Sequence, residues 1–575
     1  MNENLKVIFG LIGGLALFLF GMNSMSEALQ KAAGEKMKKI LAALTKNPLL
    51  GALAGALVTA VLQSSSATTV MVIGFVSAGL MTLPQAIAVI FGANIGTTMT
   101  AQLMAFKISD YIYPILFLGF MLNFVGKKEK IKSVGMVAFS FGMLFEGIEI
   151  MGSVMKPLAS SPLFLDLMGK VAHIPVLGIF LGAVMTLVVQ SSSATIAVLQ
   201  NFASQAGSDG VTSVIGLAGA IPILLGDNIG TTITALLASI GQSKDAKRTA
   251  VAHSVFNISG SIVFACLIPY FAKFIQWISP KGPEVEVIAR QIANAHTTFN
   301  IVCTLIWLPL LPLMVKIVTK LVRGKETKVL DHSQPRFLDE KAIAQPVAAM
   351  YQVSQEINRL LEFARIMIHN VKHVIAGKEE EEQSKAYFEH HETVKKLQEY
   401  IENYIAKLFS SGTITEQQAE QTSGLLLIST NIDRIADSCE EITNTYQIKI
   451  KQAKKKLSQD ARDDLKDCIA IAEKMFYTVM EALQNGDEKL AAEVVKNKNK
   501  MKKAQKGFNK SHLLRIKKKS SDAALTAEYA EILYSTDRIA ECCVGIAETV
   551  LDHVRFVNLE EEDAKEEIMQ EVANA

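Results

Sequence analysis

The sequence predicts an all-α protein in which a polytopic membrane unit is followed by a soluble helical bundle. Residues 1 to about 323 are rich in Gly, Ala, Leu, Ile and Val, and several of their apolar stretches reach the roughly 20 residues that span a bilayer. From about residue 340 onward the chain is dense in Glu, Lys, Asp and Gln. The net charge of +2 gives no reason to expect a nucleic-acid partner.

The apolar part contains long candidate spans and two segments of intermediate length. We place the spans at about 5–25, 84–106, 110–126, 132–156, 213–240, 247–272 and 290–322. Segment 48–81 is too long for one span and too short for two, and its polar centre divides it into arms of roughly 22 Å at about 1.5 Å per residue. Such an arm does not cross a hydrocarbon core of about 30 Å. We therefore predict re-entrant hairpins at 48–81 and 175–207, the alternative being a tilted span with its polar residues packed against neighbouring helices.

Sequence motifs that occur twice in the same order indicate a duplicated unit. The pairs are FLFGM at Phe18–Met22 with FSFGM at Phe139–Met143, QSSSA at Gln63–Ala67 and Gln190–Ala194, and GxNIGTT at Gly92–Thr98 and Gly226–Thr232. Their offsets of 121, 127 and 134 residues drift slowly, as small loop insertions would produce. We place the first repeat at 1–130, and the second repeat with the final span at 131–328.

The distribution of basic residues predicts the orientation. If each hairpin returns to its own side, the first repeat has three crossings, so the second repeat is inverted relative to it. Lys and Arg then gather on one side, at 31–46, 127–132, 244–248 and 316–325, and the positive-inside rule makes that side cytoplasmic. We expect the N-terminus outside, the tail inside, and Lys31–Lys46 as a helix lying on the inner surface.

The two QSSS runs are the candidate substrate site, because polar groups kept at membrane depth are functional by default. Each run starts a half-helix whose free N–H groups and positive dipole end suit an anion. The hydroxyls predicted to bind the anion are those of Ser64, Ser65, Ser66, Ser191, Ser192 and Ser193.

Neutral oxygen ligands near the same breaks suit a small cation such as Na⁺. The predicted ligands are Gln63, Gln190, Asn94, Thr97, Thr98, Asn228, Thr231 and Thr232, together with the acid Asp227. Asp227 either neutralises the cation or caps a helix; its partner position in the first repeat is Ala93. Because neither break contains Arg or Lys, a co-bound cation would offset the charge of the anion.

Other polar residues of the membrane unit give weaker signals. His253 with Asn257, and His296 with Asn300, share a helix face at a spacing of four, and we favour interhelical hydrogen bonding over substrate contact. A hydrolase using Ser65 or Ser192 as nucleophile lacks the base and orienting acid that such a group needs. We therefore predict that the protein is not an enzyme and uses no organic cofactor.

These motifs resemble those of a known family. The two QSSS stretches, each followed by GxNIGTT, and the string HSVFNISG at His253–Gly260 are similar to the type II sodium/phosphate cotransporter family over residues 1 to about 323. The resemblance implies a cell-membrane importer of inorganic phosphate driven by Na⁺, with Gln63–Ser66 and Gln190–Ser193 contributing to the binding of both. The first repeat lacks the HxxFN motif after its GANIGTT, which leaves the number of coupled ions open. A transporter of another oxyanion, and a phosphate sensor without net transport, are the alternatives.

The tail, which we place at 340–560, also contains a duplication. Helical periodicity predicts helices at 345–376, 384–410, 414–448, 457–485, 487–511 and 521–555. The motif DRIAD at Asp433–Asp437 returns as DRIAE at Asp537–Glu541, which predicts two three-helix units and resembles the PhoU family of phosphate-response proteins.

The resemblance of the tail suggests regulation and leaves its ligand open. Acids at i and i+4 share a helix face, so Asp433, Asp437, Asp537 and Glu541 are candidate metal ligands, the alternative being Asp–Arg pairing on the surface. The six cysteines show no zinc-type CxxC spacing, which favours free thiols in a reducing compartment. The sequence leaves a homo-oligomer open.

Overall fold

The structure divides into two compact units, Met1–Thr327 and Lys328–Ala575. It is a computed structural model, and it describes residues 3–33, 47–106, 108–159, 170, 174–207, 209–324, 332–376, 381–412, 414–452 and 457–557. Within these ranges no strand forms, and an isolated bridge joins Ala206 to Ser213. The predicted surface helix at 31–46 lies mostly outside the described residues, which stop at Ala33 and resume at Asn47.

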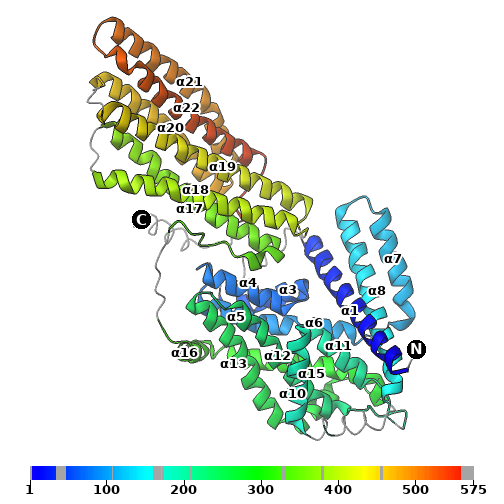
Figure 1. The fold of residues 1–575 in the computed structure, drawn as a ribbon. Coiled ribbons are helices and arrows are strands. Elements are labelled where there is room, and N and C mark those ends of the chain that lie inside the picture. The colour runs from blue at the N-terminus through cyan, green and yellow to red at the C-terminus, as the bar shows by residue number, and fades with distance from the viewer. Residues whose placement is uncertain are drawn as a thin grey trace. The chain divides into compact units, whose positions relative to one another are not determined.

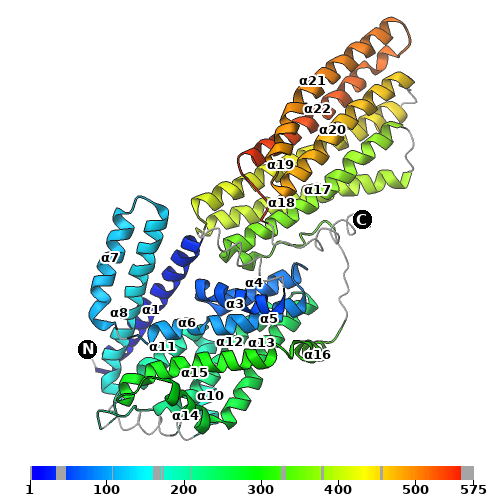
Figure 2. The same ribbon diagram turned by 180° about the vertical axis from the view of Figure 1, so that it is seen from behind.

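The named elements in the described part of the first unit are all helices (Figure 1). Its helices are α1 Glu3–Ala33, α3 Pro48–Leu62, α4 Ser65–Ser77, α5 Leu83–Gly96, α6 Thr98–Met104, α7 Ile112–Val125, α8 Glu129–Ala159, α10 Pro175–Val189, α11 Ser192–Ala203, α12 Gly216–Ala238, α13 Lys244–Cys266, α14 Ile268–Ile278, α15 Glu284–Trp307 and α16 Leu311–Leu321. Helices α1, α7 and α8 lie side by side in both views (Figures 1 and 2), and α8 is packed against both others.

The apolar segments confirm a membrane protein, although the straight span predicted at 290–322 is wrong and the one predicted at 247–272 has different ends. Among the described residues, five helical segments are long and apolar enough to cross a membrane: Lys6–Ala32, Leu83–Met104, Lys130–Val154, Gly216–Ala238 and Lys244–Cys266. The span predicted at 247–272 ends at Cys266, and Pro269 stands in the first turn of the separate helix α14. The span predicted at 290–322 bends by 88° between α15 and α16, where Pro309 and Pro312 cannot continue the helical hydrogen bonding.

Both predicted hairpins are helices that break and fold back. The hydroxyl of Thr59 in α3 donates to that of Thr68 in α4 over 2.9 Å, and the hydroxyls of Thr186 in α10 and Thr195 in α11 are hydrogen-bonded over 3.0 Å. In a straight helix, residues nine positions apart are separated by roughly 13.5 Å. The chain therefore reverses between the two threonines of each pair, at the QSSS motif.

Glycines allow each hairpin to pack tightly on the helix that follows it. A Cβ on Gly92 of α5 would lie 1.7 Å from the carbonyl oxygen of Ala52 in α3. At the matching position of the second repeat, a Cβ on Gly226 of α12 would lie 2.0 Å from the carbonyl oxygen of Ile179 in α10. This backbone-to-backbone contact is the packing typical of membrane helices, and it fixes the first arm of each hairpin against a rigid support.

The second unit is the predicted bundle of six helices. They are α17 Pro346–Ala376, α18 Glu381–Ser410, α19 Glu416–Asn444, α20 Gln459–Asn485, α21 Glu488–Lys517 and α22 Thr526–Leu551, and a π-helix, η3, continues α19 over Thr445–Gln452. Within each half the three helices pack on one another, and α17–α20 and α19–α22 contacts join the halves. Buried Arg359 of α17 pairs with Glu356 over 2.9 Å and donates to the carbonyl oxygens of His332 and Gln334, which attaches the segment before the bundle to it.

Candidate functional site

The two QSSS motifs, 127 residues apart in sequence, line one pocket of about 340 Å³. Its walls are Leu19, Met22, Asn23, Ser26, Leu62, Gln63, Ser64, Ser65, Ser66, Thr97, Val189, Gln190, Ser191, Ser192 and Ser193. All six predicted anion-binding serines are therefore brought together. Of the predicted sodium ligands, Gln63, Gln190 and Thr97 are among the walls.

The backbone makes the same unusual turn at both breaks. Gln63 has φ 51° and ψ 22°, and Gln190 has φ 55° and ψ 26°. This left-handed conformation ends α3 and α10, and a residue other than glycine adopts it at a cost of order 1–3 kcal/mol. The repetition of that strain in both halves indicates that the turn is required by the site.

After each turn, a serine begins the next half-helix. The side chain of Ser64 accepts a hydrogen bond from the N–H of Ala67, and that of Ser191 accepts one from the N–H of Ala194, each over 3.2 Å. Both are standard N-caps. The N–H groups of the residues that follow each cap have no partner within the helix, so two positive helix ends reach the pocket.

The charge of the pocket comes from backbone and hydroxyl dipoles. Its lining residues, all within the described ranges, include no Lys or Arg. Ser65 is 2% exposed and Ser193 is 8% exposed, whereas the other four serines are half-buried. A small tetrahedral oxyanion can accept hydrogen bonds from both helix ends and from rotating hydroxyls.

The two glutamines have different surroundings despite their matching backbones. Gln63 is 5% exposed, and its Oε1 accepts a hydrogen bond from Thr100 over 2.8 Å. Gln190 is exposed. The residue that matches Thr100 in the second repeat is Thr234, which instead donates to Ser66 over 3.2 Å. That bond joins the second repeat to the tip of the first hairpin.

The predicted asparagine ligands are used to bind neighbouring helices. Asn94 of α5 contacts His253 of α13 over 3.0 Å, and Asn300 of α15 donates to Asn228 of α12 over 3.3 Å. These contacts confirm interhelical hydrogen bonding by His253 and Asn300. Thr231 and Thr232 donate to carbonyl oxygens of their own helix α12, and Thr98 of α6 donates to the carbonyl oxygen of Ile95 in α5. Sodium binding by these residues stays a prediction.

Asp227 is fully buried and belongs to a hydroxyl network beside the second hairpin. Its Oδ1 accepts a hydrogen bond of 2.6 Å from Thr186, and the hydroxyl oxygens of Thr186 and Thr195 lie 3.0 Å apart. Its Oδ2 has no hydrogen-bond partner in the described structure. Thr59 and Thr68 form the matching pair in the first repeat, where Ala93 replaces the acid.

Helix α1 contributes polar residues that sequence reasoning missed. Asn23 and Ser26 line the pocket, and Ser26 donates to the carbonyl oxygen of Leu62, the last residue of α3, over 2.6 Å. The available signal was their position: Asn23 directly follows the FLFGM motif and Ser26 comes three residues later, inside a long apolar helix.

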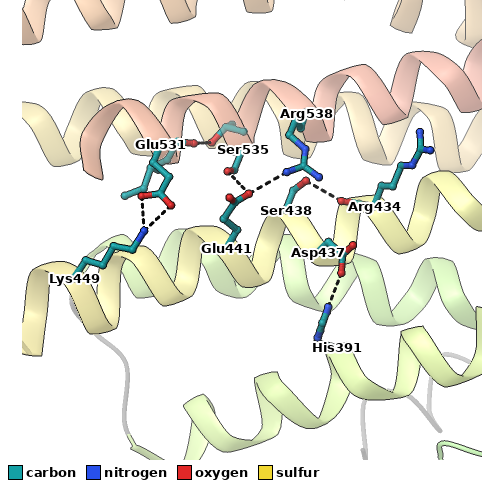
Figure 3. Close-up of polar contacts among 11 residues, drawn as sticks. His391, Arg434, Asp437, Ser438, Glu441, Lys449, Glu531, Ser535 and Arg538 are labelled. Carbon is teal, nitrogen blue, oxygen red and sulfur yellow. Dashed lines mark hydrogen bonds and ion pairs between the residues drawn. The ribbon is translucent and has the colours of Figure 1, made fainter. Parts of the chain in front are cut away.

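The tail contains a cluster with the donor set of a metal site. His391 Nε2 lies 2.9 Å from Asp437 Oδ1 and 3.3 Å from Glu440 Oε2, and one ligand atom from each lies within 4.8 Å of the others. Figure 3 shows His391 pointing from α18 toward Asp437 on α19. The sequence alone gave no histidine for this set, because His391 belongs to a different helix.

The other predicted tail ligands are placed differently. Burial, followed by the charge of Asp437, raises the pKa of Asp433, and its Oδ1 has no hydrogen-bond partner in the described structure. Burial and the nearby Glu541 raise the pKa of Asp537. Glu541 lies 3.8 Å from Lys498, so this second acid pair faces a basic side chain.

A mixed-charge pocket of about 390 Å³ adjoins the cluster. Asp437 and Glu440 line both features, and Lys449 and Arg538 line the pocket as well. Lys449 pairs with Glu531 over 2.7 Å, and Arg538 pairs with Glu441 over 3.1 Å (Figure 3). Both cationic side chains are thus neutralised by acids.

An apolar helical unit in which two broken helices direct their N-termini into one polar pocket defines a membrane protein of the transporter type. Comparison with known proteins identifies the family. The chain belongs to the Na⁺/Pi-cotransporter family, whose profile matches residues 17–153 and 154–292. The profile of the PhoU domain matches residues 357–445 and 465–550.

The curated relatives cover different parts of the chain. "Uncharacterized protein YqeW" of Bacillus subtilis is 33% identical over 266 residues, which are 46% of this chain and 84% of the relative. "Putative inorganic phosphate export protein YjbB" of Escherichia coli K12 is 22% identical over 551 residues, or 94% of this chain and 97% of the relative. Human "Sodium-dependent phosphate transport protein 2B" is 39% identical over 97 residues, 16% of this chain and 14% of that protein. No solved structure matches the chain significantly.

Proposed function

We propose that the protein is a sodium-coupled transporter that carries inorganic phosphate into the cell by alternating access. The observation that carries the proposal is the single pocket lined by both QSSS motifs, with two helix N-termini and six serines. Family membership supports phosphate as the anion.

The neutral pocket wall supports coupling to a cation. An unpaired ion taken out of water costs several kcal/mol in a protein. At an effective dielectric constant near 20, an opposite charge about 4 Å away returns about 4 kcal/mol. Since the lining residues supply no fixed positive charge, a bound Na⁺ favours the anion and the anion favours Na⁺. We assign the phosphate to Ser64–Ser66 and Ser191–Ser193, and Na⁺ to the Gln63, Gln190 and Asp227 surroundings.

The direction of transport has a specific alternative, which is the export of phosphate. Relatives that cover nearly the whole chain are named as phosphate export proteins. In a symporter, an inward Na⁺ gradient drives phosphate inward, whereas an exchanger uses the same gradient to drive phosphate outward. We propose symport in the cell membrane, with the repeats inverted, the N-terminus outside and the tail in the cytoplasm.

Proteoliposomes with labelled phosphate at the same concentration inside and outside separate these functions. An inward Na⁺ gradient should retain and accumulate phosphate, and a choline gradient should not. Gradient-driven loss of phosphate would support exchange, and the absence of any Na⁺ effect would refute sodium coupling. Excess sulfate as competitor tests the other oxyanions, and no flux at all favours a sensor. Ser65→Ala with Ser192→Ala should reduce flux, whereas Ser254→Ala, outside the pocket, should not.

We propose in addition that the tail binds a divalent metal through His391, Asp437 and Glu440. An imidazole with two carboxylates suits Zn²⁺, Mn²⁺ or Fe²⁺, and the mutual distances of these side chains fit one ion. The rival interpretation is a charge pair between protonated His391 and Asp437. Metal analysis of the purified protein, with His391→Ala as the comparison, decides between them.

A further inference from the structure

A second cavity lies in the membrane unit and shares no lining residue with the serine pocket. Its volume is about 460 Å³. It lies among the end of α6, the middle of α8, the second half of α11 and the first turns of α15. The phosphate site proposed above does not use it.

Two amides of α11 bring unpartnered acceptors to the cavity wall. Gln200 is 4% exposed, and its Nε2 donates to the carbonyl oxygens of Ala101 over 3.1 Å and Ala289 over 2.9 Å. These bonds fix the orientation of the amide, because the opposite orientation would place Oε1 against two carbonyl oxygens. The Oε1 atom is buried without a partner in the described structure.

Asn201 repeats this arrangement at the next position. Its Nδ2 donates to the carbonyl oxygen of Ile148 over 2.8 Å, and its Oδ1 is buried without a partner. An unsatisfied buried acceptor is destabilising, so two adjacent ones require an explanation. A bound cation or an ordered water is the kind of group that an acceptor can bind.

The remaining polar wall favours a cation over an anion. The carboxylates of Asp110, Glu149 and Glu286 line the cavity, and no Lys or Arg does so within the described ranges. Arg290, next to lining residue Ala289, donates to the backbone and side-chain oxygens of Gln102. The guanidinium of Arg290 lies 4.4 Å from the ring centre of the lining residue Phe106, so three carboxylates stand against one cation and the wall attracts cations.

We propose that this cavity is a cation-binding vestibule that takes Na⁺ at the oxygens of Gln200 and Asn201, with the three carboxylates attracting the ion. The three carboxylates are not gathered within ligand distance of one another in the described structure, which suits a hydrated monovalent ion better than a chelated divalent one. The proposal does not depend on phosphate transport, since it concerns the binding of a cation alone.

A cysteine placed in the cavity reports on it locally. Ser153 lines the cavity and is exposed there, so Ser153→Cys in a Cys266→Ser background gives a single accessible thiol for this purpose. The measurement is its rate of reaction with a cationic and an anionic methanethiosulfonate, in choline and in Na⁺, without phosphate. The matched control is the same protein with Asp110→Asn, Glu149→Gln and Glu286→Gln.

Neutralising the three acids should lower the cationic-to-anionic rate ratio roughly fivefold, because each carboxylate acts with opposite sign on the two reagents. Na⁺ should slow the cationic reagent, and Gln200→Met should abolish this protection. If Gln200→Met does not fold, the loss of Na⁺ protection can be measured in Asn201→Leu, and the rate ratio can still be compared with that of the neutralised control. The proposal would be overturned if the rate ratio did not change, or if phosphate protected the thiol and Na⁺ did not. It would also be overturned if neither ion protected the thiol, which is the result expected for a cavity filled with water.

Discussion

Replacing Asp227 by Asn removes one charge from the site and leaves its shape almost unchanged. The carboxylate is fully buried, its Oδ1 is held by Thr186 at 2.6 Å, and its Oδ2 has no partner in the described structure. An asparagine retains the acceptor for Thr186. The first repeat, which has Ala93 at this position, is the natural comparison within the same chain.

The expected effect follows from the attraction between the carboxylate and a sodium ion. Two opposite charges about 4 Å apart interact by about 4 kcal/mol at an effective dielectric constant near 20. Desolvation of both partners cancels part of this. If about a third to two thirds remains, or roughly 1.4–2.8 kcal/mol, the Na⁺ concentration for half-maximal phosphate uptake rises about 10- to 100-fold.

The assay is phosphate uptake into proteoliposomes over a range of Na⁺ concentrations at saturating phosphate. Asp209→Asn, an acid in an exposed loop of the same repeat, is the control. Unchanged Na⁺ dependence in Asp227→Asn, together with lower thermal stability in Asp227→Ala, would refute the charge argument. It would leave Asp227 as a hydrogen-bond acceptor that joins α12 to the second hairpin.

Three further predictions concern other parts of the chain. Gln63→Ala should lower the melting temperature of the membrane unit, because the buried hydroxyl of Thr100 loses its acceptor at a cost of about 1–3 kcal/mol. Gln190 is exposed, so Gln190→Ala should leave the melting temperature unchanged. Equal decreases in melting temperature for the two variants, measured by scanning fluorimetry, would contradict this. His391→Ala should reduce the amount of metal that copurifies with the protein to the amount found for Asp437→Asn. If His391 and Asp437 form only an ion pair, neither substitution should change the metal content. Burial raises the pKa of the Cys468 thiol to about 12, so at pH 8 only about one thiol in 10,000 is ionised. Alkylation of Cys468 in the native tail at pH 8, measured by mass spectrometry, should therefore be slow and should become fast once the tail is unfolded in urea; rapid labelling of the native tail at pH 8 would exclude this burial.

The position of both helix breaks could be predicted because local chemistry determines them. A serine run inside an apolar segment supplies N-caps, and the length of each arm excludes a full span. The meeting of Gln63–Ser66 with Gln190–Ser193 could be inferred from duplication alone. The bent pair α15–α16 was predicted as one span because the number of consecutive apolar residues does not show that Pro309 and Pro312 interrupt the helix.

Side-chain partners between distant elements could not be predicted, since no local pattern encodes them. The bond between Thr100 and Gln63 joins residues 37 positions apart, and that between Thr234 and Ser66 joins residues 168 apart. His391 was missed for the same reason: its partner Asp437 lies 46 positions away on another helix.

The internal duplication separates two kinds of feature in the serine pocket. One anion between two helix ends is contacted by both halves, so the features that hold it have to be alike, and the turns at Gln63 and Gln190 differ by only a few degrees in φ. A cation can be bound by residues of one repeat alone. The halves differ where Asp227 stands opposite Ala93, and where Gln63 is buried but Gln190 exposed. We therefore propose that the repeated features hold phosphate, and that the differences between the repeats are the positions at which sodium coupling should be tested.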